Sequence, residues 1–198
     1  MDKTLDYYNQ NADAFVSGTI DVDFTKTEER FLSYLPAGAY ILDFGCGSGR
    51  DTKYFISRGF TVDATDGSAE LCKIASKTTG IPVKQMLFSE LDAYSRYDGI
   101  WACASILHLP RKELKDVMGK MMRATKAGGY IYTSFKYGEF EGYRKGRYFT
   151  DFTSEGFAGF LNDFPQLMIT EEWVSGDIRP NRGDEKWLNL IMKKSDTV

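Results

Sequence analysis

Short apolar runs alternate with helical patterns along the first 135 residues of this chain. The apolar runs, which have the length and the β-branched or aromatic content of buried strands, occupy residues 39–44, 60–64, 81–87, 98–104 and 130–135. The helical spacing of three or four positions is clearest at Leu114, Val117, Met118, Met121 and Met122. This βα alternation predicts a parallel sheet with helices on both faces.

Capping signals mark the ends of several predicted helices. Thr25 and Glu28 have the spacing of a capping box, which predicts a helix that begins at Thr25 and stops at Pro36. Gly59 suits the left-handed position that follows a helix, and Ser68 suits the N-cap of the next helix. The helices of the first half are thereby predicted to lie between the apolar runs.

The last third of the chain has a different pattern. Residues 136–150 form a connection rich in glycine, aromatic and basic residues. A short helical pattern follows at Phe157, Phe160, Leu161 and Phe164. Two strand patterns, at residues 167–174 and 186–192, have no helix between them, so we expect them to pair antiparallel at the edge of the sheet. The predicted fold is one α/β domain, a three-layer αβα sandwich around a doubly wound, mostly parallel seven-stranded sheet with an antiparallel last strand.

The composition is that of a globular protein with an unusual number of aromatic residues. Of 198 residues, 42% are hydrophobic and 27% are charged, which excludes a disordered, collagen-like or disulfide-scaffold protein. The chain contains 12 Tyr, 14 Phe and 3 Trp. A large core absorbs many such residues, but the excess also favours a pocket with aromatic walls.

Charge and cysteine usage narrow the class of protein further. The formal net charge is −3, whereas a dedicated nucleic-acid binder is normally basic. The three cysteines lack metal-binding spacing, and the single histidine argues against a histidine-based metal centre. The first ten residues have no signal-peptide pattern, and the apolar stretch at 99–109 has about half of the roughly 20 residues that a membrane span needs. We therefore expect a soluble cytoplasmic protein without a bound metal.

A glycine-rich stretch between a predicted strand and a predicted helix is the strongest functional signal. Gly45, Gly47 and Gly49 follow Asp43 with G-x-G-x-G spacing. Glycines there permit positive φ and let a ligand approach the backbone closely. The carboxylate of Asp43 suits a cationic ligand better than a pyrophosphate, which it would repel. Asp66, at the end of the second strand, is placed to hold both hydroxyls of a ribose.

Each of these features also has a purely structural interpretation. The glycines could form a tight turn without a ligand, and Asp66 could be a turn residue before the Ser68 cap. Asp63 is a weaker candidate for the ribose, because its side chain alternates to the other face of the strand. Two acids within a βαβ pattern favour a binding site over these alternatives.

Four motifs together resemble those of the class I S-adenosylmethionine-dependent methyltransferases. They are ILDFGCGSG at 41–49, VDATDGS at 62–68, YDGIWACASILHL at 97–109 and KAGG at 126–129. The resemblance extends from about residue 6 through the final strand. It implies a Rossmann-like fold, with S-adenosyl-L-methionine as cofactor and S-adenosyl-L-homocysteine as product. Within this superfamily the chain is most similar to small bacterial methyltransferases that are often labelled tellurite-resistance-like.

The resemblance also implies where the parts of the cofactor bind. Asp43 and the glycine loop would hold its methionine part, Asp66 its ribose, and the segment after the third strand its adenine. The residues implied are Asp43, Gly45, Cys46, Gly47, Gly49, Asp66, Gly67, Ser68, Leu87, Phe88, Ala104 and Tyr8. The acid that commonly follows the third strand in the family is absent, because residues 86–89 are Met-Leu-Phe-Ser. Adenine would then depend on apolar contacts and backbone hydrogen bonds, with Ser89 or Glu90 as the replacements.

Candidates for the methyl-acceptor side lie near both ends of the chain. His108 follows the fourth strand and is either a general base or a packing histidine beneath the cofactor. The segment from Tyr7 to Phe15 resembles the one that folds over the cofactor in this family, and its alternative is an amphipathic surface helix. The residues predicted to contact the acceptor are Tyr7, Phe135, Tyr143, Arg147, Tyr148 and Trp187.

Two further segments have competing interpretations. Residues 136–149 are aromatic and basic, but Glu139 and Glu141 reduce the local charge to +2, which favours a small-molecule pocket over a nucleic-acid surface. Residues 177–182 either bring Arg179 and Arg182 to an anionic group of the acceptor or form a salt-bridged turn.

The sequence thus predicts a methyltransferase that acts on an O, N or S atom of a small-molecule acceptor. We expect a single domain over residues 1–198, with a helical lid at 1–35, a cofactor-binding core at 36–135 and a substrate-side region at 136–198. Two alternatives are a cofactor-binding protein without catalysis, such as a sensor or partner subunit, and a nicotinamide-dependent oxidoreductase. The oxidoreductase is disfavoured because the chain lacks G-x-G-x-x-G.

Overall fold

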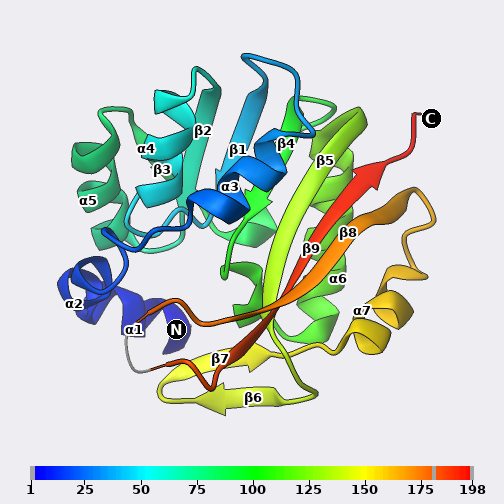
Figure 1. Ribbon diagram of the computed structural model, residues 1–198. Coiled ribbons are helices and arrows are strands. Elements are labelled where there is room, and N and C mark those ends of the chain that lie inside the picture. The colour runs from blue at the N-terminus through cyan, green and yellow to red at the C-terminus, as the bar shows by residue number, and fades with distance from the viewer. Residues whose placement is uncertain (1–2, 180–181, 197–198) are drawn as a thin grey trace.

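A seven-stranded sheet forms the centre of the protein (Figure 1). The computed structural model describes residues 3–179 and 182–196. The strands of this sheet are β1 (Tyr40–Phe44), β2 (Thr61–Asp66), β3 (Val83–Gln85), β4 (Tyr97–Ala102), β5 (Thr125–Lys136), β8 (Leu167–Gly176) and β9 (Lys186–Lys194). Their order is β3-β2-β1-β4-β5-β9-β8; β1 to β5 are parallel, and β9 lies antiparallel between β5 and β8. The predicted doubly wound sheet with an antiparallel last strand is therefore confirmed.

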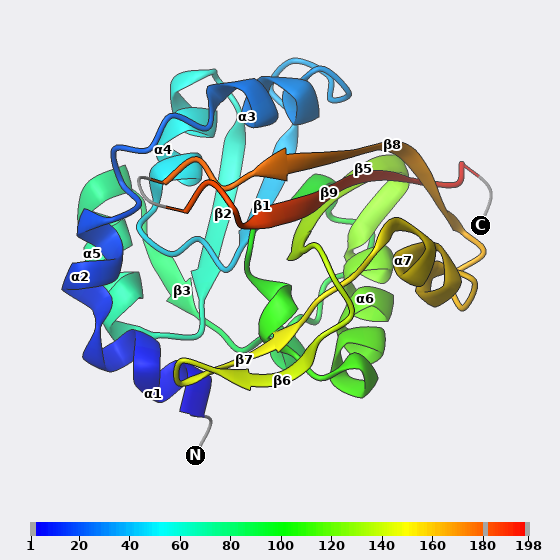
Figure 2. The same ribbon diagram turned by 60° about the horizontal axis from the view of Figure 1, so that its bottom comes forward.

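Helices cover both faces of the sheet and one of its edges (Figure 2). Those on one face are α3 (Thr25–Leu32), α4 (Arg50–Ser57) and α5 (Ala69–Thr79), and those on the other are α6 (Arg111–Ala124) and α7 (Ser154–Leu161). The remaining helical elements are α1 (Lys3–Gln10), α2 (Ala12–Ser17) and the short 3₁₀ turns η1 (Phe88–Glu90) and η2 (Ile106–His108). In the part of the chain that the structure describes, no helix has both the length and the apolar character to cross a bilayer.

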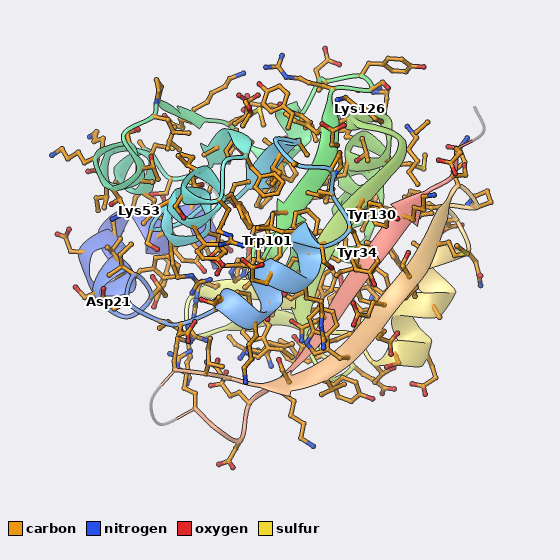
Figure 3. The ribbon with its side chains drawn as sticks, turned by 45° about the horizontal axis from the view of Figure 1, so that its top comes forward. Asp21, Tyr34, Lys53, Trp101, Lys126 and Tyr130 are labelled. Atoms are coloured by element: carbon orange, nitrogen blue, oxygen red, sulfur yellow. The ribbon has the colours of Figure 1, made fainter. Side chains whose placement is uncertain are left out.

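Aromatic side chains fill much of the core between the sheet and α3 and α4. The Trp101 ring stacks on Tyr132 with 3.9 Å between centroids, and Phe31 packs against Trp101 at 5.2 Å. Trp101 lies beneath α3, and the Tyr34 and Tyr130 rings lie side by side near it (Figure 3). A large part of the aromatic excess is therefore core packing, because burial of such rings contributes strongly to stability.

The predicted start of α3 is correct, but its predicted cap is wrong. The Thr25 side chain makes no capping hydrogen bond; instead its backbone N–H donates to Asp23 Oδ1 at 3.0 Å. Glu28 is buried rather than turned back toward the helix start. The helix ends at Leu32, before Pro36. The sequence therefore predicted the position of the helix correctly, although the capping box on which that prediction rested does not form.

Other predicted boundaries are close to the observed ones. Ser68 accepts a hydrogen bond from the Leu71 N–H at 3.2 Å, as expected of an N-cap, and Gly59 has a φ of +86°. The third strand is shorter than predicted and spans only Val83–Gln85. The fifth strand is longer and begins at Thr125, where it already pairs with Tyr97.

Residues 136–150, predicted as a plain connection, contain a β-hairpin. Its strands are β6 (Glu141–Arg144) and β7 (Arg147–Thr150), and its turn residues, Lys145 and Gly146, have φ values of +47° and +82°. Two positive φ values are typical of the tight turn that matches the twist of a hairpin. The Tyr148 N–H donates to Thr4 Oγ1 at 3.1 Å, so the hairpin lies against α1 at the carboxyl ends of the parallel strands (Figure 2).

Candidate active site

A cavity of about 830 Å³ lies at the carboxyl ends of the parallel strands. Loops that follow β1, β2, β3 and β4 form its walls, and α1, α2, β7 and the segment between β8 and β9 close it. The predicted residues on its wall are Tyr8, Gly45, Cys46, Gly47, Asp66, Gly67, Leu87, Phe88, Ala104, His108, Arg147 and Trp187. Its volume is in the range of small-molecule and cofactor sites.

The glycine loop between β1 and α4 is packed too closely for side chains. A Cβ at Gly45 would lie 2.5 Å from Ser105 Cβ, and one at Gly49 would lie 2.8 Å from Thr79 Cγ2. Both glycines have positive φ values, +88° and +80°, which other residues adopt only with strain. The backbone at Gly45 and Gly47 therefore forms the cavity wall itself, whereas Gly49 packs against α5.

Asp66 joins the glycine loop to the end of β2. Its Oδ2 accepts a hydrogen bond from Gly47 N–H at 2.9 Å, and its Oδ1 accepts one from Ser68 N–H at 2.8 Å. Burial raises the pKa of this carboxyl. Asp63 forms an ion pair with Arg96 at 3.0 Å and does not line the cavity. The structure thus separates the two acids of β2 as the strand alternation predicted.

Asp43 lies behind the glycine loop rather than on the cavity wall. Its Oδ2 accepts a hydrogen bond from the Thr52 hydroxyl at 2.5 Å, and its side chain is buried. Burial and the neighbouring Asp51 raise its pKa to about 8. The charged groups that do line the cavity here are Asp51 and Arg50, whose atoms Oδ1 and Nε are 2.5 Å apart.

Glu28 is the third carboxyl of this buried group. Its Oε1 has no hydrogen-bond partner among the described residues. Burial, and then the charge and hydrogen bond of Asp51, raise the pKa of Glu28 to about 9. Trp101 Nε1 donates to the other side of Asp51, at Oδ2, over 2.7 Å. Glu28 is therefore protonated in the folded protein at neutral pH, and it links α3 to the cavity wall.

We expect Glu28→Gln to stabilise the ligand-free protein at pH 8. Above its ordinary pKa of 4.5 the unfolded chain loses the Glu28 proton, while the folded chain keeps it up to about pH 9, so stability falls as pH rises between these values. Glutamine keeps a donor toward Asp51 and does not titrate. Urea unfolding should show a gain of about 1–3 kcal/mol at pH 8 and no gain at pH 4.

The matched control for this prediction is Glu29→Gln. Glu29 is the next residue on α3, and its carboxylate pairs with Arg58 at the surface, 3.0 Å from Nε. Exposed pairs contribute little to stability. A gain at pH 8 in both variants, or in neither, would contradict the buried proton on Glu28.

A chain of hydrogen bonds crosses the cavity wall from Arg147 to His108. Arg147 Nη1 donates to the Tyr8 hydroxyl at 3.2 Å, and that hydroxyl lies 2.8 Å from His108 Nε2. His108 Nδ1 lies 2.6 Å from the backbone carbonyl oxygen of Tyr148. A carbonyl only accepts, so Nδ1 carries the ring proton and Nε2 accepts from Tyr8. Residues from α1, η2 and β7 are thereby joined.

His108 is neutral in this arrangement. Burial and the charges of Arg147 and Arg144 together lower its pKa to about 4, against the opposing effect of the hydrogen bond to the Tyr148 carbonyl. The Nε2 lone pair is already used by the Tyr8 hydroxyl. His108 is therefore a weak base whose position is suited to orienting Tyr8.

Comparison with known proteins agrees with this geometry. Residues 41–129, which include the glycine loop and Asp66, match the family described as a methyltransferase domain. Residues 41–129 thus carry a methyltransferase domain. The class I S-adenosylmethionine-dependent type that the sequence motifs predicted agrees with the observed sheet order and with this match. The narrower tellurite-resistance-like assignment remains a prediction.

Individual proteins similar to this methyltransferase domain include two curated relatives and a solved structure. An uncharacterized protein of Methanocaldococcus jannaschii is 31% identical over 106 residues, which cover 49% of this chain and 28% of that protein. An S-adenosyl-L-methionine-dependent Diels-Alderase of Talaromyces variabilis is 28% identical over 122 residues, covering 56% and 41%. The chain thus spans less than half the length of these relatives.

The solved structure is that of Burkholderia thailandensis 1,6-didemethyltoxoflavin-N1-methyltransferase with bound 1,6-didemethyltoxoflavin and S-adenosylhomocysteine. It has a TM-score of 0.77 and 21% identity, over 97% of this chain and 85% of that one. At this identity the likeness shows a shared fold.

Several residues predicted for the site lie off the cavity wall of the methyltransferase domain. Phe135 is fully buried in the core, where it packs against Phe152 at 4.9 Å. Tyr7 packs its ring against the Arg147 guanidinium at 4.7 Å. The others that do not line the cavity are Asp43, Gly49, Ser68, Tyr143 and Tyr148. For Tyr143 and Tyr148 the reason is the orientation of the hairpin, whose inward face presents Arg147 and Phe149 to the cavity instead.

The segment after β3 contains the two residues predicted to replace the absent adenine-binding acid, Ser89 and Glu90. Ser89 lies on the cavity wall beside Leu87 and Phe88. Glu90 does not: its Oε2 accepts a hydrogen bond from Leu87 N–H at 2.7 Å and so closes the η1 turn. Of the two predicted replacements for the absent acid, only Ser89 faces the cavity.

The segment between β8 and β9 contains a salt-bridged turn. Asp177 accepts hydrogen bonds from Arg179 Nε at 2.9 Å and Nη2 at 2.5 Å, and from Trp187 Nε1 at 3.1 Å. These donors hold the pKa of Asp177 well below its usual range. Residues 180 and 181, within the predicted segment, lie outside the described residues, while Arg182 lines the cavity.

Sequence reasoning missed Arg50, Asp51 and Glu28. Arg50 and Asp51 directly follow the last glycine of the loop, so their position at the start of α4 was an available signal. Glu28 lies on α3, far from the motifs in sequence, and only the packing of α3 on the sheet brings it to Asp51. Its capping-box spacing pointed to a different role.

Proposed function

We propose that this protein transfers the methyl group of S-adenosyl-L-methionine to an O, N or S atom of a small-molecule acceptor. The observation that carries the proposal is that the matched methyltransferase domain, residues 41–129, places its glycine loop and Asp66 on the wall of a single cavity. The small-molecule acceptor is supported by the size of that cavity and by the Burkholderia structure, which is described with a small molecule bound.

The residues on the wall fit the parts of this cofactor. Gly45 and Gly47 leave room for close approach to the backbone, and the Asp66 carboxylate is placed to accept hydrogen bonds from ribose hydroxyls. Leu87 and Phe88 offer apolar surface to the adenine, with Ser89 as a polar neighbour. These are the groups that we propose hold the nucleoside.

We propose that Arg50 and Asp51 bind the amino-acid end of the cofactor. That end carries one carboxylate and one ammonium, and the two side chains present one charge of each sign to the cavity. Asp43, predicted for this role, does not line the cavity. It would then influence the cofactor indirectly, through its electrostatic interaction with Asp51.

When bound, the cofactor supplies an electrophilic methyl group on its sulfonium. The protein therefore has mainly to position the acceptor and to exclude water, and such positioning is worth roughly 7–11 kcal/mol of barrier reduction. We propose that Tyr8 closes the cavity from α1 and contacts the acceptor. His108 holds the Tyr8 hydroxyl from below, so its role is to position Tyr8 rather than to serve as a general base.

We also propose the predicted division of the chain into a lid at 1–35, a cofactor-binding core at 36–135 and a substrate-side region at 136–198, all within one domain. Tyr8 on the lid and Arg147 in the substrate-side region meet over the cavity at 3.2 Å, which supports this division. The three cysteines are free thiols, which fits the cytoplasmic location that we expect.

A second candidate is catalysis of a ring closure in which the cofactor is bound but not consumed. It is favoured by the curated relative described as an S-adenosyl-L-methionine-dependent Diels-Alderase. In that case the same cavity would bind the cofactor while the acceptor side shapes a reacting carbon chain.

The test is an assay for S-adenosyl-L-homocysteine across a library of small metabolites that carry free hydroxyl, amine or thiol groups. We expect product formation to depend on one chemical class of acceptor and to be matched by methyl incorporation. Binding of the cofactor without turnover of any acceptor would instead favour the ring-closing or the non-catalytic candidate.

A further inference from the structure

Arg147 is a cavity-lining arginine without a carboxylate partner. Eight of the ten arginines in the chain have an Asp or Glu oxygen within 4.0 Å of a guanidinium nitrogen. Among residues 3–179 and 182–196, the other two are Arg147 and Arg182. Beside the hydrogen bond from Lys136, the charge of Arg182 acts on Glu185 and lowers its pKa, which leaves Arg147 as the exception. Charged groups that are partly withdrawn from water are normally paired, so this exception points to a ligand.

Aromatic rings surround the Arg147 guanidinium, and two of them, Tyr8 and Phe149, line the cavity. The guanidinium Cζ lies 4.7 Å from the centroid of Tyr7, 5.7 Å from that of Tyr8 and 5.2 Å from that of Phe149. These contacts fix the plane of the guanidinium and remove water from it, but they do not neutralise its charge.

One edge of the guanidinium is left without a hydrogen bond. Nη1 donates to the Tyr8 hydroxyl, whereas Nε is buried and has no partner among the described residues. No hydrogen bond of Nη2 to a described residue is present either. The Nε–Nη2 edge is the parallel pair of donors that carboxylates bind in a bidentate manner.

The surroundings of Arg147 add to its positive field. Arg144 and Arg147 both lower the pKa of His108, and Arg179 is close enough to interact with Tyr8. Arg144 is paired with Asp151 at 2.6 Å, and Arg179 is paired with Asp177. Of these three arginines, only Arg147 has no carboxylate partner among the described residues, so its charge is available to a ligand.

We infer that the methyl acceptor is an aromatic acid, whose carboxylate binds the Nε–Nη2 edge of Arg147 and whose ring packs against Tyr8 and Phe149. The inference rests on the proposed function and adds a substrate class to it. A guanidinium on aromatic walls matches a planar ring with an attached carboxylate better than it matches an aliphatic or a neutral acceptor.

The test is calorimetric titration of the protein, saturated with S-adenosyl-L-homocysteine, with four probes. Benzoate carries both the ring and the charge, benzamide only the ring, and acetate only the charge; cyclohexanecarboxylate replaces the flat ring. We expect benzoate to bind tightest, by about tenfold or more over benzamide and over acetate, because a charged bidentate hydrogen bond and ring contact each contribute.

Arg147→Gln should lower the affinity for benzoate by about tenfold or more and leave that for benzamide unchanged, while Arg147→Lys should recover only part of the loss. The control is Lys112→Gln, which removes one positive charge from an exposed position on α6 that does not line the cavity. We expect the control to change benzoate affinity by less than about twofold, because an exposed charge is screened by salt.

Equal binding of benzoate and benzamide to the unaltered protein, or no binding of benzoate at millimolar concentration, would overturn the inference. So would an equal loss of benzoate affinity in Arg147→Gln and Lys112→Gln, which would indicate a general effect of net positive charge rather than a binding site at Arg147. Affinity for S-adenosyl-L-homocysteine, measured on the same samples, reports separately on the proposed function. Its absence in the unaltered protein would refute that function irrespective of the probe results.

Discussion

Asp66→Ala is expected to weaken the binding of S-adenosyl-L-methionine by about tenfold or more, because two hydrogen bonds from ribose hydroxyls to a carboxylate are lost. The loss should be accompanied by a lower melting temperature. In the structure the same carboxylate accepts hydrogen bonds from Gly47 and Ser68, so it also holds the glycine loop against β2. Calorimetric titration with the cofactor measures the first effect, and thermal unfolding without ligand measures the second.

Asp63→Asn is the matched control for Asp66. Both acids lie on β2, but Asp63 pairs with Arg96 and Tyr97 outside the cavity. Its replacement should leave cofactor affinity unchanged. Asp66→Asn retains one acceptor oxygen and should fall between the unaltered protein and Asp66→Ala. Unchanged affinity in both Asp66 variants would show that the ribose binds elsewhere.

Tyr8→Phe is expected to lower kcat/KM for the acceptor by about 10- to 100-fold, because the hydroxyl that links Arg147 to His108 is removed. The ring remains, so cofactor affinity should change by less than about threefold. His108→Asn should produce a similar loss, since the Tyr8 hydroxyl loses its acceptor at Nε2. Steady-state kinetics with a separate titration of the cofactor distinguish the two quantities.

The pH profile separates a positioning role of His108 from general-base catalysis. With a pKa of about 4, the neutral form of His108 is complete above about pH 5, so kcat/KM should show no inflection from His108 between pH 6 and 8. An inflection near pH 6.5 that disappears in His108→Asn would instead identify His108 as the base. Tyr94→Phe, at an exposed tyrosine remote from the cavity, controls for loss of a hydroxyl as such.

The core of the fold could be predicted because local signals agree with the tertiary structure there. After Asp98, the run at 98–104 is apolar on both faces, as a strand covered by helices on both sides requires, and the structure places β4 in the middle of the sheet. Ser68 forms the predicted cap, and the apolar stripe of α6 is buried as its spacing indicated. Such agreement is expected where burial and local propensity favour the same conformation.

The β6–β7 hairpin could not be predicted with the same rules. Its strands are short, and their sequences, EGYR and RYFT, do not alternate between polar and apolar positions. The turn at Lys145 requires a positive φ from a residue other than glycine, which is uncommon. Contacts with α1, including the hydrogen bond from Tyr148 N–H to Thr4, lie more than a hundred residues away in sequence and supply what local propensity lacks.

Part of the candidate site could likewise be predicted from the sequence, and part depends on tertiary packing. Asp66 and the glycine loop could be predicted because each lies at the carboxyl end of a strand, β2 or β1, and these ends are adjacent in the sheet. Arg147 was identified as a substrate-side residue, but the lack of a carboxylate beside it is a property of tertiary packing. The position of Asp43 behind the cavity wall likewise depends on a tertiary contact, the hydrogen bond from the Thr52 hydroxyl in the first turn of α4. Sequence motifs therefore indicate which residues belong to the site more readily than they indicate the orientation and the contact partners of each side chain.

The central claim is that the cavity built by the glycine loop, Asp66 and Tyr8 binds S-adenosyl-L-methionine. Calorimetric titration of the unaltered protein with S-adenosyl-L-methionine, S-adenosyl-L-homocysteine and NAD tests it most directly. We predict saturable binding of the first two with one site for each protein chain, and no binding of NAD. Failure to bind either sulfur compound, or tighter binding of NAD, would contradict the account.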